Sequence, residues 1–438
     1  MLSIAELPKY EPYKESGADW LGEIPKNWTI RKISHVFKTV GSGTTPASGN
    51  KNYYDGGVPW VQTGDLNDGV LSSTKKTITN KAIKDLPALR VYKKGSLIIA
   101  LYGATIGKLC QLGVDAATNQ ACCVMDDPVN ANTKFVFYLL AGYKVNIISM
   151  AYGGGQPNIS QDLIKSLRLP FPELERQVLI AKFLDKKTTQ IDDAIAIKEQ
   201  QIALLKERKQ IIIQKAVTQG LDPNVPMKDS GVDWIGQIPA HWDIVPNKKI
   251  FSLKKNLVGK KSDQYELLSL TLRGVIKRDM ENPEGKFPAE FDTYQKVRAG
   301  DFVFCLFDVE ETPRAVGLSS HDGMITGAYT VFGADSAVSK EFLYLFYLNL
   351  DSRKMLRPLY RGLRNTIPKD AFLSFKTPLP SLREQKEIVR FVGVEISRTE
   401  LGMAHMAEQI AKLKEYKATL INAAVTGKIK ITPDMVEG

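Results

Sequence analysis

The sequence predicts an α+β protein that contains two tandem copies of one module, each followed by a long helix. Three observations support this fold class. A tryptophan-rich segment near the N-terminus occurs a second time in the middle of the chain. In each copy, short runs of β-branched and aromatic residues alternate with candidate helices. Each copy then continues into a long stretch whose apolar positions have a helical period.

The repeat is clearest at residues 14–28 and 228–242, which share the pattern Ser-Gly-x-Asp-Trp-x-Gly-x-Ile-Pro-x-x-Trp. Later parts of the copies also match, at a slightly smaller offset, as in Leu169–Pro172 and Thr377–Pro380. A chain of 438 residues is too long for one ordinary core. With two copies and a period near two hundred residues, the pattern indicates domain duplication rather than a solenoid.

The part of each copy that precedes Pro172 or Pro380 predicts a mixed module. Val58–Gln62, Ser96–Tyr102 and Asp301–Phe307 are typical of strands, and Gly, Asn, Asp and Pro between such runs indicate long loops. Helical candidates at 133–150 and 340–357 make each module α+β rather than all-β.

Behind each of these prolines the period becomes helical. Ser381–Glu384 predicts a capping box, in which the serine caps an amide and Glu384 reaches back to the cap. A narrow stripe follows, with spacings that alternate between four and three, and the two copies match at a constant offset of 208. Its members are Ile191, Ile195, Lys198, Ile202, Leu205, Lys209, Ile212 and Ala216, then Thr399, Met403, Met406, Ile410, Leu413, Lys417, Leu420 and Ala424.

Such a stripe needs a helical partner, and the equivalent helix of the other copy is the obvious one. Helices of about 40 residues extend roughly 60 Å, so pairing them would hold the modules several tens of Å apart. The alternative is that each helix folds back on its own module, which its length and polar faces disfavour. Lys198 and Lys209 on the stripe indicate either a partner-binding or register-setting position, or simply charges that extend to solvent.

Composition points to a polyanionic partner. Lysine and arginine number 59 against 48 aspartates and glutamates, which gives a net charge of +11 and favours nucleic acid. No apolar run approaches the roughly 20 residues that span a bilayer, and we expect a cytoplasmic protein because no export signal is recognisable. Four cysteines without CxxC spacing predict buried free thiols and no metal site.

Several motifs carry a family resemblance. The Asp-Trp-x-Gly-x-Ile-Pro-x-x-Trp lead-in, Thr44–Pro46, Val58–Trp60, Gly154–Ile159 and the Pro-x-Pro-x-Leu-x-x-Gln helix start resemble specificity subunits of type I restriction-modification systems. The resemblance covers nearly the whole chain and implies two target-recognition domains and two spacer helices in an antiparallel coiled coil, with a pseudo-twofold internal repeat. The second module departs from the pattern, since Arg361–Thr366 replaces the glycine run.

The resemblance also implies partners and a division of the chain. It implies assembly with two methyltransferase subunits and with restriction (translocase) subunits. It implies a non-catalytic chain without cofactors of its own, S-adenosylmethionine, ATP and Mg²⁺ being used by the partner subunits. The implied parts are a lead-in (1–27), the first target-recognition domain (28–172), the central spacer helix (173–220), the repeated lead-in (221–241), the second target-recognition domain (242–380) and the C-terminal spacer helix (381–438).

Two similar modules that are free to diverge predict the reading of an asymmetric, bipartite sequence in double-stranded DNA. Base edges are read by side chains with paired donors and acceptors, which loops of these modules carry. In the first module we favour Thr44, Thr45, Lys51, Asn52, Tyr54, Gln62, Tyr102, Asn119, Gln120, Gln156 and Asn158. In the second we favour Lys254, Lys255, Arg273, Arg278, Asp308, Arg314, Tyr329, Arg361, Arg364 and Asn365.

Individual residues in these sets are more often phosphate or surface contacts, so the prediction rests on the loops rather than on single side chains. Trp20, Trp28, Trp234 and Trp242 occupy identical places in both copies, which favours a structural role over base stacking.

Other function classes find less support. Gly103–Lys108 lacks one residue of a phosphate loop, and the histidines are too scattered for a hydrolytic or metal site. The alternative function is a non-catalytic coiled-coil scaffold that binds protein partners only, which explains the helices but not the basic charge and polar loops.

Overall fold

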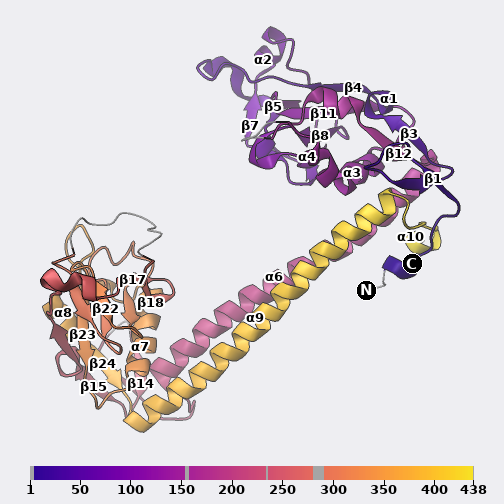
Figure 1. Ribbon diagram of the computed structural model, residues 1–438. Helices are drawn as coiled ribbons and strands as arrows, with labels where there is room; N and C mark the ends of the chain where they lie inside the picture. Colours follow the sequence, from indigo (N-terminus) through magenta and orange to yellow (C-terminus); the bar gives the residue numbers. More distant parts are fainter. Residues whose placement is uncertain (1–3, 153–156, 233–234, 280–290, 438) are drawn as a thin grey trace. The chain divides into compact units, whose positions relative to one another are not determined.

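The computed structural model describes residues 4–152, 157–232, 235–279 and 291–437 (Figure 1). The chain forms two compact units: unit 1 is Met1–Lys198 with Glu408–Gly438, and unit 2 is Glu199–Ala407. Each unit contains one globular module and one end of each of two long helices. No helix formed by the described residues is both long and apolar enough to cross a membrane.

Unit 1 contains a five-stranded sheet in the order β4-β11-β8-β9-β6, antiparallel except where β6 pairs with β9. Its strands are β4 (Phe37–Ser42), β6 (Gly69–Leu71), β8 (Leu97–Ala100), β9 (Leu109–Leu112) and β11 (Cys122–Pro128). A second sheet contains β5 (Tyr54–Val61), β7 (Lys76–Ile78) and β10 (Ala117–Thr118). The helices are α1 (Ile33–Val36), α2 (Asn80–Asp85), α3 (Thr133–Gly142), α4 (Lys144–Ser149) and α5 (Gln161–Ser166).

Unit 2 is built on the antiparallel sheet β16-β23-β20-β21. The strands are β16 (Phe251–Lys254), β20 (Phe302–Phe304), β21 (Val316–Leu318) and β23 (Thr330–Ala334). Two smaller pairs are β17 (Leu268–Thr271) with β18 (Gly274–Lys277), and β19 (Gln295–Val297) with β22 (Gly323–Ile325). Helices α7 (Lys340–Ser352) and α8 (Lys369–Ser374) complete the module.

The core of unit 2 is aromatic. The ring of Phe251 lies 5.3–5.9 Å from the rings of Phe302, Phe304, Phe332, Tyr347 and Phe372. Most of these pairs are edge-on or tilted, as aromatic rings prefer in protein interiors. The packing explains the aromatic runs that the sequence places in β20 and α7.

The duplication is visible in the strand pairing. Each lead-in forms a hairpin, β1 (Tyr13–Glu15) with β2 (Glu23–Pro25) and β13 (Met227–Asp229) with β14 (Gln237–Pro239). The next strand of each copy pairs with the strand before the long helix. These pairs are β3 (Thr29–Lys32) with β12 (Arg168–Phe171), and β15 (Asp243–Pro246) with β24 (Lys376–Leu379). The predicted internal repeat is confirmed.

The long helices are α6 (Leu174–Gln219), with 46 residues, and α9 (Leu382–Val425), with 44. In unit 1, Lys198 Nζ donates to Gln409 Oε1 at 2.6 Å and Lys417 Nζ lies 2.7 Å from Asp192 Oδ2. Residue numbers rise on one helix as they fall on the other, so the helices are antiparallel and lie side by side (Figure 1). The predicted α+β class with an antiparallel pair of long helices is confirmed.

The end of the chain differs from the predicted spacer helix over 381–438. Helix α9 ends at Val425, and Gly427 has a φ of +75° that breaks it. The chain then returns along the lead-in, where the N–H of Lys430 donates to the carbonyl oxygen of Pro8 at 2.7 Å. A short helix, α10 (Asp434–Glu437), follows.

The start of α9 corrects the predicted capping box. Ser381 Oγ accepts from the N–H of Glu384 at 3.3 Å, as expected of a cap. The Glu384 side chain does not return to the cap: it accepts from Trp242 Nε1 at 3.0 Å and lies 2.9 Å from His241 Nε2. The indole of Trp242 is fully buried, so the bond to Glu384 avoids the cost of leaving its N–H without an acceptor.

Cys110, Cys122, Cys123 and Cys305 are buried and free, as predicted. Burial raises the pKa of Cys122 and of Cys123 to about 12, from the usual 9.0. These thiols therefore stay protonated and act as small apolar side chains.

Candidate nucleic-acid interface

Each module is joined to its long helix by one buried glutamine. Gln177 Oε1 accepts the N–H of Asn132 at 2.9 Å, and its Nε2 donates to the carbonyl oxygen of Pro172 at 2.8 Å. Gln385 makes the equivalent bonds, to Ser339 at 2.8 Å and to the equivalent proline at 2.9 Å. Since Asn132 and Ser339 cap α3 and α7, each glutamine connects the first turns of two helices.

The repeated tryptophans are part of the same framework. Trp28 and Trp242 are 0% exposed, which confirms their structural role. Trp20 is half-buried and its ring lies 5.3 Å from that of Tyr143, edge to face. Trp234 lies outside the described residues.

In unit 1, backbone hydrogen bonds bring together loops that are far apart in sequence. The N–H of Leu101 donates to Ala121 at 2.9 Å, and the N–H of Ile159 donates to Leu101 at 2.8 Å. The N–H of Asn119 donates to Val61 at 3.0 Å. The resulting first loop cluster comprises residues 44–46, 62, 102, 119–120 and 157–158.

Side chains and a backbone bridge complete this cluster. Thr45 Oγ1 donates to Gln120 Oε1 at 2.6 Å, and Tyr102 bridges to Asn158. Gln156 belongs to the residues that the structure does not describe. The predicted residues that the structure brings together are Thr44, Thr45, Gln62, Tyr102, Asn119, Gln120 and Asn158.

Three predicted residues are placed differently. Tyr54 is linked to the cluster through its hydroxyl, which donates to the carbonyl oxygen of Pro46 at 2.5 Å. Lys51 and Asn52 form a separate 3-10 turn, where Thr79 Oγ1 donates to the carbonyl oxygen of Asn52 at 2.8 Å. Both are exposed and stay predictions for a phosphate or base contact outside the cluster.

In unit 2, a second loop cluster comprises residues 271–274, 307–314 and 360–366. Arg314 Nη2 donates to the carbonyl oxygen of Leu272 at 2.9 Å, which joins the first two loops. The N–H of Asp308 donates to the carbonyl oxygen of Arg364 at 2.8 Å, which joins the last two. The guanidinium of Arg364 also binds the carboxylate of Asp308 through Nε, at 3.0 Å, and through Nη2.

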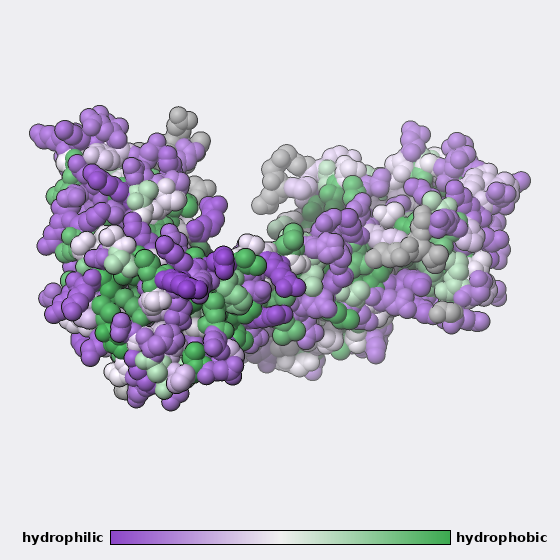
Figure 2. All heavy atoms as spheres, turned by 90° about the horizontal axis from the view of Figure 1, so that it is seen from below, coloured by the Kyte–Doolittle hydropathy of each residue, from purple (hydrophilic) through white to green (hydrophobic). Residues whose placement is uncertain are grey.

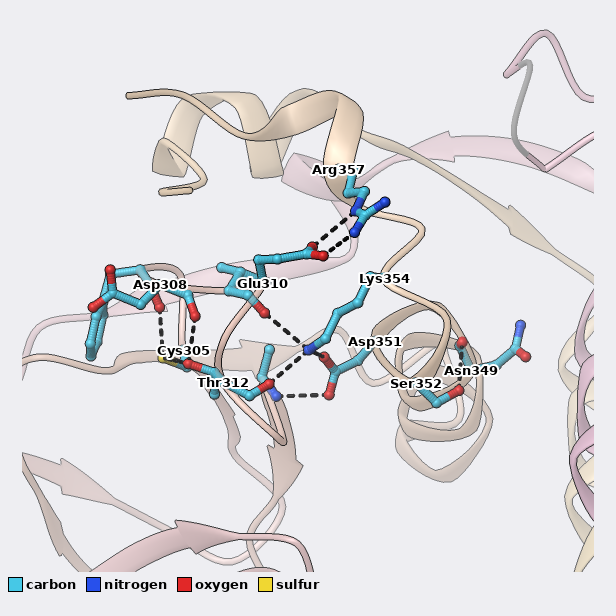
Figure 3. Close-up of polar contacts among 12 residues, drawn as sticks. Cys305, Asp308, Glu310, Thr312, Asn349, Asp351, Ser352, Lys354 and Arg357 are labelled. Carbon is cyan, nitrogen blue, oxygen red and sulfur yellow. Dashed lines mark hydrogen bonds and ion pairs between the residues drawn. The ribbon is translucent and has the colours of Figure 1, made fainter. Parts of the chain in front are cut away.

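An ion pair between the buried Asp351 and the partly buried Lys354 supports the acidic loop of this cluster (Figure 3). Lys354 Nζ donates to the carbonyl oxygens of Val309 and Thr312, at 2.9 and 2.7 Å, and to Asp351 Oδ1 at 3.0 Å. The other oxygen of Asp351 accepts the N–H of Ala315 at 2.7 Å. Because buried charges need such partners, the network holds the loop in one conformation.

The backbone of the cluster is strained. Asp308, Lys354 and Asn365 have φ values of 45°, 50° and 43°, in the left-handed region that side chains disfavour. Such residues persist where the surrounding structure imposes them, and they gather at ligand-binding and switch regions. Two such residues lie in the second loop cluster, and the third, Lys354, binds its acidic loop. This surface is therefore a functional candidate.

Ion pairs keep the acidic residues charged and the arginines in place. The Arg364 guanidinium lowers the pKa of the Asp308 carboxyl, and Arg357 lowers the pKa of Glu310, in each case mainly through a side-chain hydrogen bond. The arginines are therefore oriented by carboxylates rather than free in solvent.

An aromatic platform beneath Arg364 is a feature that sequence reasoning missed. The Phe307 ring is stacked with that of Tyr329, with centroids 6.2 Å apart, and the Arg364 guanidinium lies 5.6 Å from the Phe307 centroid. Phe307 has no local signal, since it ends a strand-like run. The predicted residues brought together here are Arg273, Arg314, Tyr329, Arg361, Arg364, Asn365 and Asp308.

Lys254, Lys255 and Arg278 lie elsewhere in the module. Lys254 Nζ is 2.6 Å from the buried carboxylate of Asp301, so its charge is compensated within β16 and its neighbours. Lys255 follows as an exposed residue. Arg278 follows β18, where its N–H donates to Leu267 at 2.8 Å. None of the three is joined to the second loop cluster by a contact described above.

Helix α7 separates this cluster from the long helices of unit 2. At its N-terminal end, the Phe342 ring lies 6.3 Å from that of Trp242. At its C-terminal end, Asp351 binds Ala315 beside the cluster. Thirteen residues of helix span about 20 Å. The cluster therefore lies at the end of the module that faces away from the α9 start.

The surface is mainly hydrophilic on the face that Figure 2 draws, with smaller hydrophobic areas among the hydrophilic ones.

Known proteins share this architecture. Residues 25–207 match the family model of the type I restriction modification DNA specificity domain. The type I restriction enzyme MjaVIII specificity subunit of Methanocaldococcus jannaschii is 25% identical, over 98% of this chain and 99% of the relative. The EcoR124I/EcoR124II specificity subunit of Escherichia coli is 23% identical over 40% of this chain and 42% of its own.

Solved structures share the fold. A chain from a structure that describes complex assembly and conformational transition of the type I R-M system has a TM-score of 0.65 at 14% identity, covering 94% of this chain and 99% of that chain. The HsdS subunit from Thermoanaerobacter tengcongensis has a TM-score of 0.52 at 16% identity, covering 93% and 98%. Residues 25–207 thus match the type I restriction modification DNA specificity domain, and over nearly its whole length the chain is similar to type I restriction enzyme specificity subunits.

Proposed function

We propose that the chain reads an asymmetric, bipartite sequence in double-stranded DNA, one half with each module. The observation that carries this proposal is divergence on a duplicated scaffold. The first loop cluster is lined by uncharged Thr, Asn, Gln and Tyr side chains, whereas the second carries four arginines. Amide side chains suit adenine and arginine suits guanine, so loops of such different chemistry fit different half-sites.

Specificity subunits of this family are not enzymes, and the chemistry is proposed to belong to partners. We propose that two methyltransferase subunits and restriction (translocase) subunits bind the chain. S-adenosylmethionine, ATP and Mg²⁺ would then be bound by those subunits, in the cytoplasm, where the DNA is.

Exposed apolar residues on the long helices support helical partners. Ile197, Leu204 and Ile211 are 57%, 57% and 43% exposed and follow one another at intervals of seven along α6. On α9, Val394 and Leu401 are 60% and 73% exposed at the same interval. A seven-residue interval keeps side chains on one helical face, as in helix bundles. Partner docking on the helices leaves the loop clusters available to DNA.

The first test measures DNA recognition by the chain in complex with its methyltransferase subunits. Methylation sequencing of host DNA defines the target, and binding to a duplex that contains it should weaken steeply as salt rises, because phosphate contacts release counterions. Exchange of residues 29–165 for those of a relative should change one half of the target. A complex without sequence preference would leave the protein-only scaffold as the function.

A single-residue variant sharpens the same test. Gln120→Ala should weaken recognition of one half-site by roughly 1–3 kcal/mol, since an amide that pairs with a base edge contributes about that much discrimination. Asn80→Ala, an exposed amide of the same module that lies outside the cluster and is not a predicted contact, is the control and should change the target preference little. Equal effects of both variants on one half-site would show that the cluster is not the reading surface.

A further inference from the structure

The turn Arg361–Thr366 presents a leucine to solvent. The Leu363 side chain has a relative exposure of 104%, the highest among the large hydrophobic residues that the structure describes. Gly362, with φ of +69°, and Asn365, with φ of +43°, reverse the chain on either side and place Leu363 at the tip. A large apolar side chain that its own fold leaves in water gains free energy when a ligand buries it.

The turn is held firmly at its base. The N–H of Arg361 donates to Thr366 at 2.8 Å, and the N–H of Thr366 donates back at 3.1 Å. The bond from Asp308 to Arg364 and the ion pair between their side chains attach the turn to the loop that Lys354 supports. These bonds hold the turn, and with it Leu363, in one conformation.

Two arginines flank the leucine. Arg361 Nη1 donates to the carbonyl oxygen of Tyr360 at 2.8 Å, which folds its guanidinium onto the base of the turn. Arg364 binds the Asp308 carboxylate through Nε and Nη2, and its Nη1 does not take part in this ion pair. Both arginine side chains are exposed, so the Arg361 guanidinium at the base of the turn and the Arg364 guanidinium beside Asp308 can meet phosphates.

A second leucine–arginine pair lies in the same cluster. Leu272 is 64% exposed at the turn between β17 and β18, and Arg273 follows it. Arg314 binds the carbonyl oxygen of Leu272 and so connects this turn to the loop beside Asp308. The apolar tips thus belong to one surface that also carries arginines.

Building on the proposed function, we propose that Leu363 is a wedge that inserts between two stacked base pairs at the half-site read by the second module. Leucine is one of the side chains that proteins insert between base steps, and burial of its surface offsets the loss of stacking. The exposed arginines beside it suit the phosphates next to the opened step. Because the turn Arg361–Thr366 is already ordered, binding does not incur the entropy cost of ordering it.

DNA fits this tip better than a protein partner does. The arginine on each side complements phosphates, and the tip lies at the end of α7 that faces away from the start of α9. The exposed apolar residues proposed for protein partners lie instead on α6 and α9.

The test uses the full chain in complex with its methyltransferase subunits and duplexes that carry the target found by methylation sequencing. Fluorescent base analogues, 2-aminopurine for adenine and pyrrolocytosine for cytosine, replace successive bases of each half-site. Methyltransferases extrude the adenine that they methylate, so the analogues are not placed at the methylated adenines. At the remaining positions, the wild-type complex should raise emission several-fold at one step of the half-site read by the second module, because an unstacked analogue is no longer quenched. Leu363→Ala should abolish that rise and weaken binding at least tenfold, while Leu363→Met should restore both.

Leu221→Ala, which shortens an exposed leucine beyond the end of α6, is the matched control and should leave emission unchanged. A thermal melt identical to wild type shows that Leu363→Ala is folded, as its full exposure predicts. If sequence-specific binding persists but emission does not rise in the wild type, or rises equally in Leu363→Ala, the wedge is wrong and the proposed function stands. Loss of subunit assembly in Leu363→Ala, with unstacking retained, would reassign the leucine to a protein contact. Absence of sequence preference in the wild type would instead overturn the proposed function.

Discussion

Gln177 and Gln385 each satisfy two backbone groups where a module meets its long helix. They are 1% and 2% exposed, so water does not reach the groups that they bind. A leucine of similar size would leave a buried N–H and a buried carbonyl oxygen without partners. The repeated glutamine therefore connects each module to its long helix. It occurs in both copies because both connections use the same hydrogen bonds.

We predict that Gln385→Leu lowers the free energy of unfolding by about 1–3 kcal/mol, the usual cost of buried groups left without hydrogen bonds. Denaturant unfolding of the full chain measures this change. Gln201→Leu, at an exposed position of α6 in the same unit, is the control and should stay within about 0.5 kcal/mol of wild type. Equal losses in the two variants would show that the buried bonds contribute nothing specific.

At the scale of elements, the long helices are held in register by two equivalent ion pairs. Lys417 binds Asp192 in unit 1, and Lys209 binds Glu400 at 3.0 Å in unit 2. The second pair follows from the first by the offset of the repeat, since 417 − 209 and 400 − 192 both equal 208. Of the alternatives open for Lys209, the structure therefore favours the register-setting position.

We predict that Lys209→Glu lowers the thermal unfolding midpoint, because two carboxylates would then face each other, and that Glu400→Lys added to it restores the midpoint. The pair itself contributes less than about 1 kcal/mol, because solvent screens the half-exposed Glu400. A double-mutant cycle in low salt isolates the interaction, which should shrink in high salt. Lys206→Glu, at an exposed position one turn away, serves as the control. Failure of the charge swap to restore stability would show that Lys209 only extends to solvent.

At the scale of the whole molecule, the paired helices are proposed to set the separation of the two half-sites. Adding one heptad to both α6 and α9 preserves their pairing and lengthens each helix by about 10 Å. We predict that the unread spacer in the DNA target grows by about three base pairs while both half-sites keep their sequences, since base pairs rise about 3.4 Å each. Methylation sequencing reads the result directly. An unchanged spacer, with methylation retained, would contradict the role of the helices as a ruler.

Most of the architecture could be predicted from local patterns in the sequence. The duplication, the α+β class and the long helices were predictable because strand runs, helical periods and repeated motifs are encoded in residues close together. The polar and arginine-rich composition of the loops between strands also stands out locally, and the role of these residues in DNA recognition stays a prediction. The paired helices were predictable because a narrow apolar stripe needs a partner.

Contacts between distant residues were decided by the tertiary structure. Glu384 accepts the buried indole N–H of Trp242, 142 residues earlier, and no spacing rule announces such a partner. Lys51 and Asn52 fell outside the first loop cluster because the fold of β5 carries them to a separate turn.

By itself the sequence determined that this protein is two divergent modules on a duplicated scaffold, because motifs and periodicity are local properties of the chain. The tertiary structure alone decided which loops meet, that Phe307 lies beneath Arg364, and that Leu363 stands at the tip of a rigid turn. The physical reason is that strand pairing and buried ion pairs join residues that the chain separates widely, and only the folded state satisfies them together.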